Sequence, residues 1–330
     1  MTLKNNSKLQ IHTESMMVTV SAGPQLHMKR FCADKVNPGT PVFMVHGLAE
    51  DGHIFYSGRG KGLAPYLAAE GYDVYVADMR GSGKSWPSVS PKSTHGQHQA
   101  INEDIPALLR AIVRKRGPIP QIWISHGWGG VITSSNFARY GDAHAPVQAM
   151  VYFGSRRLVL DNGWRKNFAL KVLWKTGLSL ASRVTGYVPT RRFKIGTTNE
   201  TRKNFSDALR WMFTEPWLDP EDEFDYQLSA KMRRFPASLY LACASDTVYG
   251  CPDDVRHFIA GLGEHNGQLI VLGKSGGSLQ DYGHIGMLSA VEAEADHFPA
   301  LLDWLDTQAD NRKSFGDEMT PNRPPEALEA

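Results

Sequence analysis

Asp246 and His284 are the two residues that first suggest chemistry. Asp246 comes just past the apolar segment 238–242, and His284 lies in the late segment Asp281-Tyr-Gly-His-Ile-Gly286. A carboxylate at the end of a strand can orient a histidine through its Nδ1–H and leave Nε2 free as a general base. Each residue alone is more often part of a turn or loop, so the pair counts as a site only if other elements position it.

The segment Ile122–Gly130 carries the strongest local pattern. Its sequence, Ile-Trp-Ile-Ser-His-Gly-Trp-Gly-Gly, reads as an apolar strand that turns through small residues into a helix expected over 131–140. A nucleophile elbow needs such a turn, because it lifts one side chain to the top of the sheet while small neighbours let strand and helix approach closely. Ser125, Gly127 and Gly129 take the first, the nucleophile and the last position of G-x-S-x-G. The nucleophile position therefore holds a glycine.

On these residues the chain resembles the α/β-hydrolase superfamily, specifically its bacterial esterase, lipase and monoacylglycerol-lipase-like members, over roughly residues 42–305 apart from one insertion. The resemblance implies that Asp246 and His284 are the acid and base of a Ser-His-Asp triad, with Gly127 at the nucleophile position. It also implies a carboxylic-ester hydrolase that needs no cofactor. The expected substrate is a small-molecule or lipid ester with an apolar acyl or alcohol part.

Two further segments resemble the same family. Val45-His-Gly-Leu48 follows a predicted strand, and in the family this turn gives a backbone N–H to the oxyanion hole, here that of Leu48, with the N–H of Trp128 as the second donor. The segment 77–85 is similar to the family pattern D-x-R-G-x-G-x-S, in which Asp78 and Arg80 are expected to be structural. A phosphate-binding loop would need a different glycine spacing there.

Gly127 leaves three explanations open. The elbow position usually has a positive φ, which costs other residues about 1 kcal/mol or more and costs glycine almost nothing, so the fold should survive. The glycine can replace a serine, with ester hydrolysis lost or impaired; it can mark a non-catalytic protein that binds a ligand or partner; or the His284–Asp246 dyad can act alone as a base. Ser125 lies one layer lower, and Cys243 and Cys251 have no predicted base, so they are poor substitutes for the nucleophile.

Alternating strands and helices predict an α/β fold, a mostly parallel sheet flanked by helices with a helical cap insertion. We expect the α/β-hydrolase core at 1–155 and 236–310, the cap or lid at 156–235, and a disordered tail at 311–330. Segments 9–13 and 26–31 are expected to form an antiparallel edge. The parallel strands are expected at 41–45, 73–77, 121–124, 147–153, 238–242 and 268–272. Helices are expected at 62–70, 97–114, 128–140, 253–262 and 292–305.

The expected cap is rich in Lys, Arg and aromatic residues, and it carries few acids between 156 and 203. A basic, aromatic helix can rest on an anionic membrane surface, but the simpler interpretation is that its apolar side covers the pocket and its basic side faces water. Either arrangement makes the pocket apolar. Trp174, Trp211 and Phe213 are the expected substrate contacts, although helical spacing within 205–213 favours core packing first.

Composition argues against several other classes of protein. The net charge of +2 gives no reason to expect nucleic acid as a partner. Three cysteines form neither a disulfide framework nor a zinc pattern, residues 1–8 lack the apolar core of a secretion signal, and no apolar run reaches the roughly 18 residues that span a bilayer. We therefore expect a cytoplasmic protein. His95 and His98 can share a helix face, but no nearby ligand completes a set, so no metal is expected.

Overall fold

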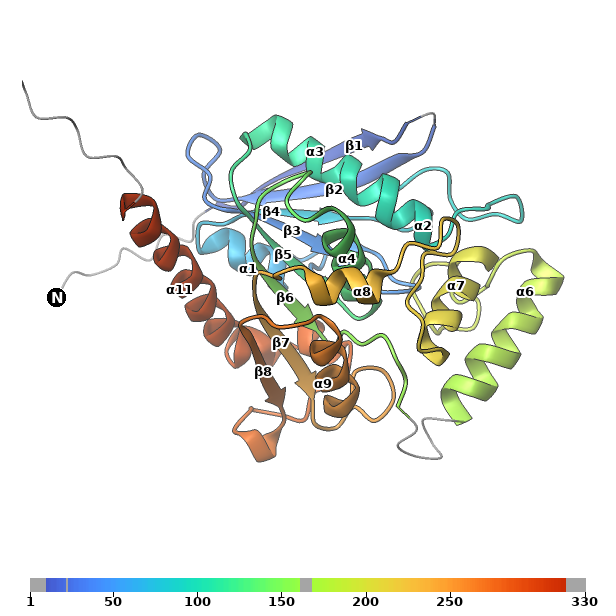
Figure 1. The fold of residues 1–330 in the computed structure, drawn as a ribbon. Helices are drawn as coiled ribbons and strands as arrows, with labels where there is room; N and C mark the ends of the chain where they lie inside the picture. The colour runs from blue at the N-terminus through green and yellow to red at the C-terminus, as the bar shows by residue number, and fades with distance from the viewer. Residues whose placement is uncertain (1–9, 22, 161–167, 319–330) are drawn as a thin grey trace, which may run out of the picture.

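An eight-stranded sheet runs through the computed structural model, which describes residues 10–21, 23–160 and 168–318 (Figure 1). The strand order is β1-β2-β4-β3-β5-β6-β7-β8, and all pairs are parallel except β1 with β2 and β2 with β4. The strands are β1 (His12–Thr19), β2 (Gln25–Cys32), β3 (Pro41–Val45), β4 (Asp73–Ala77), β5 (Gln121–His126), β6 (Val147–Phe153), β7 (Ala237–Cys243) and β8 (Gly267–Leu272). The predicted α/β class and mostly parallel sheet are confirmed.

The first strand lies later in the chain than the sequence analysis expected. β1 covers His12–Thr19 rather than 9–13, and it pairs with β2 from His12 opposite Cys32 to Thr19 opposite Gln25. The short turn between Thr19 and Gln25 sets this register, because the length of a hairpin loop decides which residues face each other. The antiparallel edge itself was predicted correctly.

Helices cover both faces of the sheet. They are α1 (Leu63–Ala69), α2 (Gln97–Gln99), α3 (Ile105–Arg116), α4 (Trp128–Tyr140), α6 (Ser179–Thr185), α7 (Arg202–Phe213), α8 (Tyr226–Met232), α9 (Pro252–Gly261), α10 (Gly286–Ser289) and α11 (His297–Glu318). Two π-helical stretches join them, Ala100–Asp104 before α3 and Phe168–Leu178 before α6, and 3₁₀ turns occur at Gly52–Ile54, Lys274–Gly276 and Val291–Glu294. None of the helices in the described ranges is long and apolar enough to cross a membrane.

The expectation of a disordered tail from residue 311 is wrong for its first part. Helix α11 continues to Glu318, and residues 319–330 lie outside the described ranges. Extending an existing helix needs no new nucleus, so a polar segment can continue a helix that it could not start.

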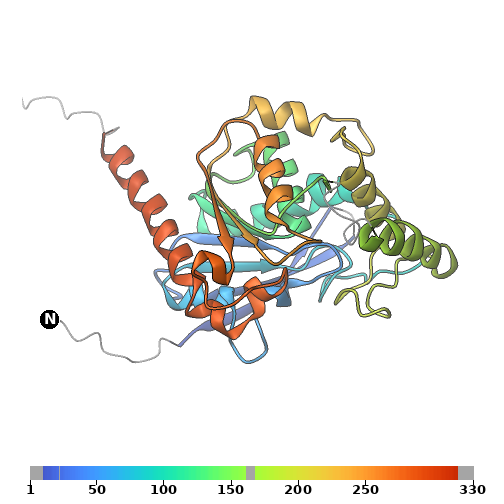
Figure 2. The same cartoon turned by 90° about the horizontal axis from the view of Figure 1, so that it is seen from below.

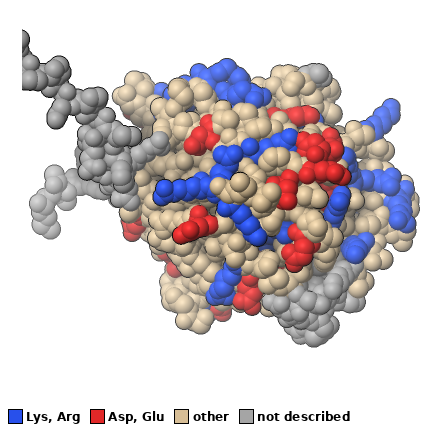
Figure 3. Space-filling view, in the orientation of Figure 1, with Lys and Arg blue, Asp and Glu red and all other residues tan. Residues whose placement is uncertain are grey.

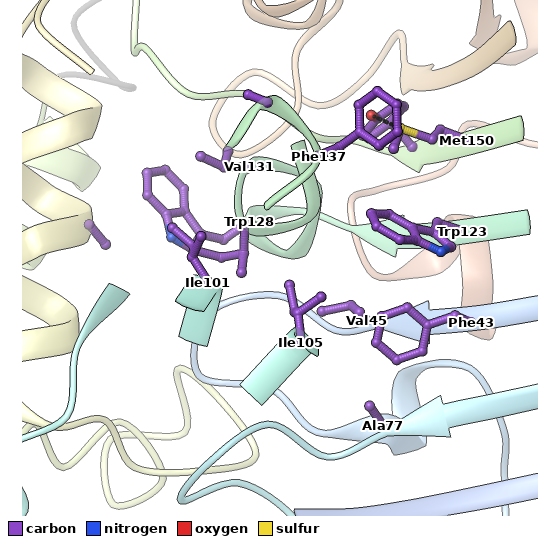
Figure 4. Packing of buried hydrophobic residues seen from close by; sticks show 14 of the residues in the cluster. Phe43, Val45, Ala77, Ile101, Ile105, Trp123, Trp128, Val131, Phe137 and Met150 are labelled. Atoms are coloured by element: carbon purple, nitrogen blue, oxygen red, sulfur yellow. Dashed lines mark hydrogen bonds between the residues drawn. The ribbon is translucent and has the colours of Figure 1, made fainter. Parts of the chain in front are cut away.

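Alternating side chains along each strand divide the core into two layers. In β3, Phe43 and Val45 join the layer under α3 and α4, whereas Val42 and Met44 join the layer under α1 and α11. Figure 2 shows α1 and α11 on one side of the sheet and α4 and α9 on the other, and Figure 4 shows the first layer. This packing holds the parallel strands in place, so that the loops after them meet at the carboxyl end of the sheet.

The segment between β6 and β7 is helical where it is described. Figure 1 shows α6 and α7 beyond one end of the sheet, while α8 packs against α4. The part of the insertion that stands away from the sheet therefore ends before α8. It lies at the end that carries the loops after β5, β6 and β7.

Candidate active site

Gly127 is the turn between β5 and α4. It has φ 49° and ψ −120°, and its N–H donates to the carbonyl oxygen of Phe153 at 2.8 Å. A Cβ added to Gly127 would lie 3.0 Å from Nε2 of His284. A side chain at this position would thus point directly at the histidine, as the sequence pattern predicts for an elbow.

Gly129 is the position where strand and helix come closest. A Cβ there would lie 2.5 Å from the carbonyl oxygens of both Val45 and His46, and this contact is with backbone that cannot rotate away. We expect Gly129→Ala to lower the free energy of unfolding by about 3 kcal/mol in a denaturant titration, because overpacking forces the backbone apart. Gly58→Ala is the matched control, since nothing lies within 4 Å of its Cβ. Equal stability of the two variants would contradict the close approach.

Asp246 and His284 meet beside Gly127. Oδ2 of Asp246 lies 3.4 Å from Nδ1 of His284, which is longer than an ordinary hydrogen bond. Gly154 and Gly250 make room for the ring, because a Cβ on either would lie within 3.0 Å of Nδ1. The sequence analysis chose both residues, and the structure brings them together in the order acid, histidine, elbow.

The carboxylate of Asp246 is held ionised. It accepts backbone N–H groups of Val248 and Tyr249 on Oδ1 and of Gly250 on Oδ2, at 2.8–2.9 Å. Burial alone would raise its pKa, but His284 and these amides outweigh burial and lower the pKa of Asp246 to about 2. Burial, together with the charge of His126, lowers the pKa of His284. His284 is therefore a neutral base at neutral pH, with Nε2 toward the cavity.

The two expected oxyanion donors face the same cavity. Leu48 follows β3, and Trp128 is the first residue of α4. Both line the cavity together with Gly127 and His284. Neither backbone N–H has a hydrogen-bond partner in the part of the chain that the structure describes. Free amides in this position can stabilise a developing oxyanion by about 3 kcal/mol each.

The cavity has a volume of about 760 Å³ and a mainly apolar wall. Of the three expected substrate contacts, Trp174 lines it, whereas Trp211 and Phe213 are absent from the described lining. Trp211 is only 1% exposed and packs in the core, with its Nε1–H donating to the carbonyl oxygen of Leu218. The residue that α7 places on the cavity is Met212, because helix rotation turns its two neighbours to other faces.

Glu50 and His126 form a second acid–histidine pair that the sequence analysis missed. Oε2 of Glu50 lies 2.7 Å from Nδ1 of His126 and accepts the N–H of Gly47 at 2.8 Å. Nε2 of His126 lies 3.1 Å from the carbonyl oxygen of His284. The pair therefore ties together the oxyanion turn, the elbow and the loop of His284. His126 occupies the variable second position of G-x-S-x-G, which gave no signal.

This pair is ionic. Burial alone would raise the pKa of Glu50, but His126 outweighs it and lowers the pKa to about 2, and Glu50 raises the pKa of His126 despite burial of the ring. The carboxylate contributes stability above about pH 4.5 that is lost toward pH 2. The imidazolium contributes stability below about pH 6.5 that is lost as pH rises through its raised pKa. The contribution is therefore largest between these two pH values.

We expect Glu50→Gln to lower the free energy of unfolding by about 2–3 kcal/mol near pH 6, because it leaves a buried imidazolium unpaired. Urea titrations across pH should show the difference shrinking toward both pH 3 and pH 9. Asp51→Asn is the control, because the ion-pair partner of Asp51 within the described residues is the half-exposed His53. A difference that is constant with pH would contradict the ion pair.

Substitute nucleophiles find no support. Ser125 is 1% exposed, and its Oγ lies 2.9 Å from Oγ1 of Thr133. Cys243 is fully buried, and burial together with Asp246 raises the pKa of its thiol to about 12.

Asp78 and Arg80 are structural as predicted: Asp78 accepts the N–H groups of Gly52 and Lys84, and Arg80 pairs with Asp104.

Two groups of potential metal ligands come together, and the sequence analysis identified neither. One is Glu50 with His126 and His284, and the other is His98 with Asp219 and Asp222. His98 Nδ1 lies 2.7 Å from Asp219, which is 121 residues away, so spacing alone could not reveal the pair. Both groups are engaged in internal pairs, and the chemistry considered below uses His284 of the first group as a base without routing a step through a metal.

Comparison with known proteins agrees with this fold. A family profile described as alpha/beta hydrolase fold matches residues 40–218. No curated protein sequence matches the chain significantly. Similar solved structures include an esterase from Pyrococcus furiosus (15% identity, 91% of this chain and 92% of that chain, TM-score 0.59) and a bromoperoxidase from Bacillus anthracis (14%, 89% and 100%, 0.57). A meta-cleavage product hydrolase from Pseudomonas fluorescens is also similar (17%, 89% and 97%, 0.53). Since the profile covers more than half of the chain, the chain belongs to the alpha/beta hydrolase fold family.

Proposed function

We propose that the protein has a carboxylic-ester hydrolase site of the Ser-His-Asp type in which Gly127 holds the nucleophile position. The observation that carries the proposal is the 3.0 Å between a Cβ on Gly127 and Nε2 of His284. In this scheme His284 is the base, Asp246 orients it, and the N–H groups of Leu48 and Trp128 hold the oxyanion. The chain as it stands binds the ester and turns it over slowly or not at all. Restoring a serine at 127 tests the proposal, as argued in the Discussion.

The rival function from a different class is binding without catalysis, and a third is base catalysis by the dyad alone. The lowered pKa of His284 favours the third, because a neutral imidazole next to an empty elbow position can accept a proton from a bound substrate. The serine variant separates these readings. A dyad enzyme loses space at 127 and gains no esterase activity, whereas an ester hydrolase gains it.

We also propose that this protein is cytoplasmic and that its cap binds an anionic membrane surface. Leu180 and Val184 are one turn apart on α6, and they are 61% and 85% exposed. Arg183 lies between them, and in Figure 3 the cap edge at the right of the view shows Lys and Arg at its outer part. Apolar side chains beside cations are typical of helices that lie at a membrane interface.

We expect the protein to sediment with vesicles of phosphatidylglycerol and phosphatidylcholine more than with phosphatidylcholine alone. The double variant Leu180→Gln with Val184→Gln should weaken this binding about tenfold, because two apolar side chains no longer leave water. Leu228→Gln, an equally exposed leucine on α8, is the control. No sedimentation with anionic vesicles at either low or moderate salt would rule out the membrane contact.

A further inference from the structure

The ionisable residues of the cavity wall are unbalanced toward positive charge. Among the lining residues Glu50 is paired with His126, and Asp51 accepts the N–H of His53 and lies 3.1 Å from its Nδ1. Three cations line the same cavity: Arg156, Arg191 and Lys194. An ester with only apolar parts gives these cations nothing to bind.

Arg156 lies in the wall of the cavity that Gly127 and His284 also line. It follows Gly154 by two residues and is 4% exposed. Its Nε donates to the carbonyl oxygen of Tyr249 at 2.5 Å, and its Nη2 donates to that of Val248 at 3.2 Å. Nη1 is buried and has no hydrogen-bond partner among the described residues. A buried donor without an acceptor costs about 1–3 kcal/mol, more when charged, so this arginine is kept in the cavity wall at a cost to stability.

One carboxylate near Arg156 offsets part of this charge. Oδ2 of Asp254 lies 3.5 Å from Nε of Arg156, and its Oδ1 accepts the N–H of Leu160 at 3.1 Å. Asp254 does not itself line the cavity among the described residues. It therefore holds the guanidinium in the wall.

Arg191 and Lys194 belong to a segment that is hydrogen-bonded to the turn after Leu48. The N–H groups of Thr197 and Thr198 donate to the carbonyl oxygen of Ala49 at 2.9 and 3.2 Å, and Oγ1 of Thr198 donates to that of Glu50 at 3.0 Å. Both cationic side chains are exposed, and no carboxylate in the described ranges pairs with either. These hydrogen bonds attach the segment to the turn that carries Leu48, and both exposed cations line the same cavity as Leu48.

We propose that the cavity selects an ester that carries an anionic group, a carboxylate or a phosphate, in addition to its apolar part. Arg156 in the wall and Arg191 and Lys194 at the mouth provide the complementary charge, and the apolar wall with Trp174 and Met212 accepts the chain. This substrate class rests on the proposed ester site. The binding preference itself requires no turnover.

The test is a calorimetric titration of the chain as it stands with two ligands that share one diacid chain, monomethyl suberate and dimethyl suberate. We expect the monoanion to bind at least tenfold more tightly at low salt. The preference should fall in 0.5 M NaCl, because the Debye length there is on the order of 4–5 Å and salt screens the charges. Octyl phosphate compared with octanol forms a second arm, which distinguishes phosphate from carboxylate. Equal binding of the charged and neutral member in both arms would overturn the proposal.

Three variants assign the effect to the cations. Arg191→Gln with Lys194→Gln, both at exposed positions, should reduce the preference at least threefold, and Arg156→Gln should reduce it further, while Arg156→Lys retains part of it. Arg210→Gln removes an exposed cation of α7 outside the cavity and should leave the preference unchanged. A preference that survives the double variant and Arg156→Gln, with melting temperatures intact, would also overturn the proposal.

The two proposals fail separately. If the anion preference appears while the serine variant gains no esterase activity, the ester proposal fails and the anion site stands. If the serine variant gains esterase activity and no anion preference appears, only the anion site is rejected.

Discussion

Gly127→Ser should raise kcat/KM for short- and medium-chain p-nitrophenyl esters by at least about 10³-fold over the chain as it stands. Removing the serine from an intact triad costs up to about 10⁶ in kcat, and in the proposed site the acid, the histidine and the two backbone amides are the remaining parts. The full factor is not expected, because the new Cβ lies 3.0 Å from Nε2 of His284 and the ring must move. Movement toward Asp246 would shorten the 3.4 Å separation between the carboxylate and Nδ1.

Gly127→Ala is the matched control for this gain. It introduces the same Cβ, the same contact with His284 and the same strain at φ 49°, but no hydroxyl. Both variants should lose about 1–2 kcal/mol of stability, since a non-glycine residue is held at positive φ. Only the serine variant should gain activity. Similar rates for the two variants would mean that His284 does not act on a residue at 127.

Asp246→Asn in the Gly127→Ser protein should lower kcat by about 10⁴-fold. An amide can hold the histidine in the wrong tautomer and cannot stabilise the imidazolium that forms during the reaction. Asp253→Asn is the control: it removes a neighbouring carboxylate that is exposed on α9 and pairs with Arg256. A loss of less than tenfold for Asp246→Asn would show that the carboxylate does not orient His284.

The same protein should show a pH profile set by His284 alone. With the pKa of Asp246 at about 2, the acid stays ionised wherever the protein is assayed. The pKa of His284 is lowered, so activity should decrease only below the ordinary histidine value near 6.5, as the base becomes protonated. In the Asp246→Asn variant the acidic limb should move to lower pH, because the carboxylate that raises the pKa of His284 is gone.

The elbow was predictable because a local pattern marks it, and Asp246 and His284 were predictable because they follow it in the order that the family resemblance implies. The turn at Gly127 needs small residues at fixed offsets, and Asp246 comes three residues after a buried strand, so sequence order places both at one end of a parallel sheet. The parallel strands were also predictable, since runs buried on both faces stand out as continuous apolar segments.

The misassigned residues depend on packing between distant segments. Trp211 and Phe213 were chosen for their type, but only the rotation of α7 decides that Met212 reaches the cavity. Glu50 and His126 are 76 residues apart, one in the loop after β3 and the other at the end of β5, so neither spacing nor composition could link them. The charge of Arg156 was noted as part of a basic cap, whereas its place in the cavity wall follows from the course of the chain after β6.

Labelling with a serine-directed fluorophosphonate tests the central claim most directly. The site is proposed to be complete except for its nucleophile, so the chain as it stands and Gly127→Ala should remain unlabelled. Gly127→Ser should be labelled stoichiometrically, at the introduced serine by peptide mass spectrometry, and should lose that labelling when His284 is changed to alanine. A folded Gly127→Ser protein that stays unlabelled, or one labelled equally without His284, would contradict the claim.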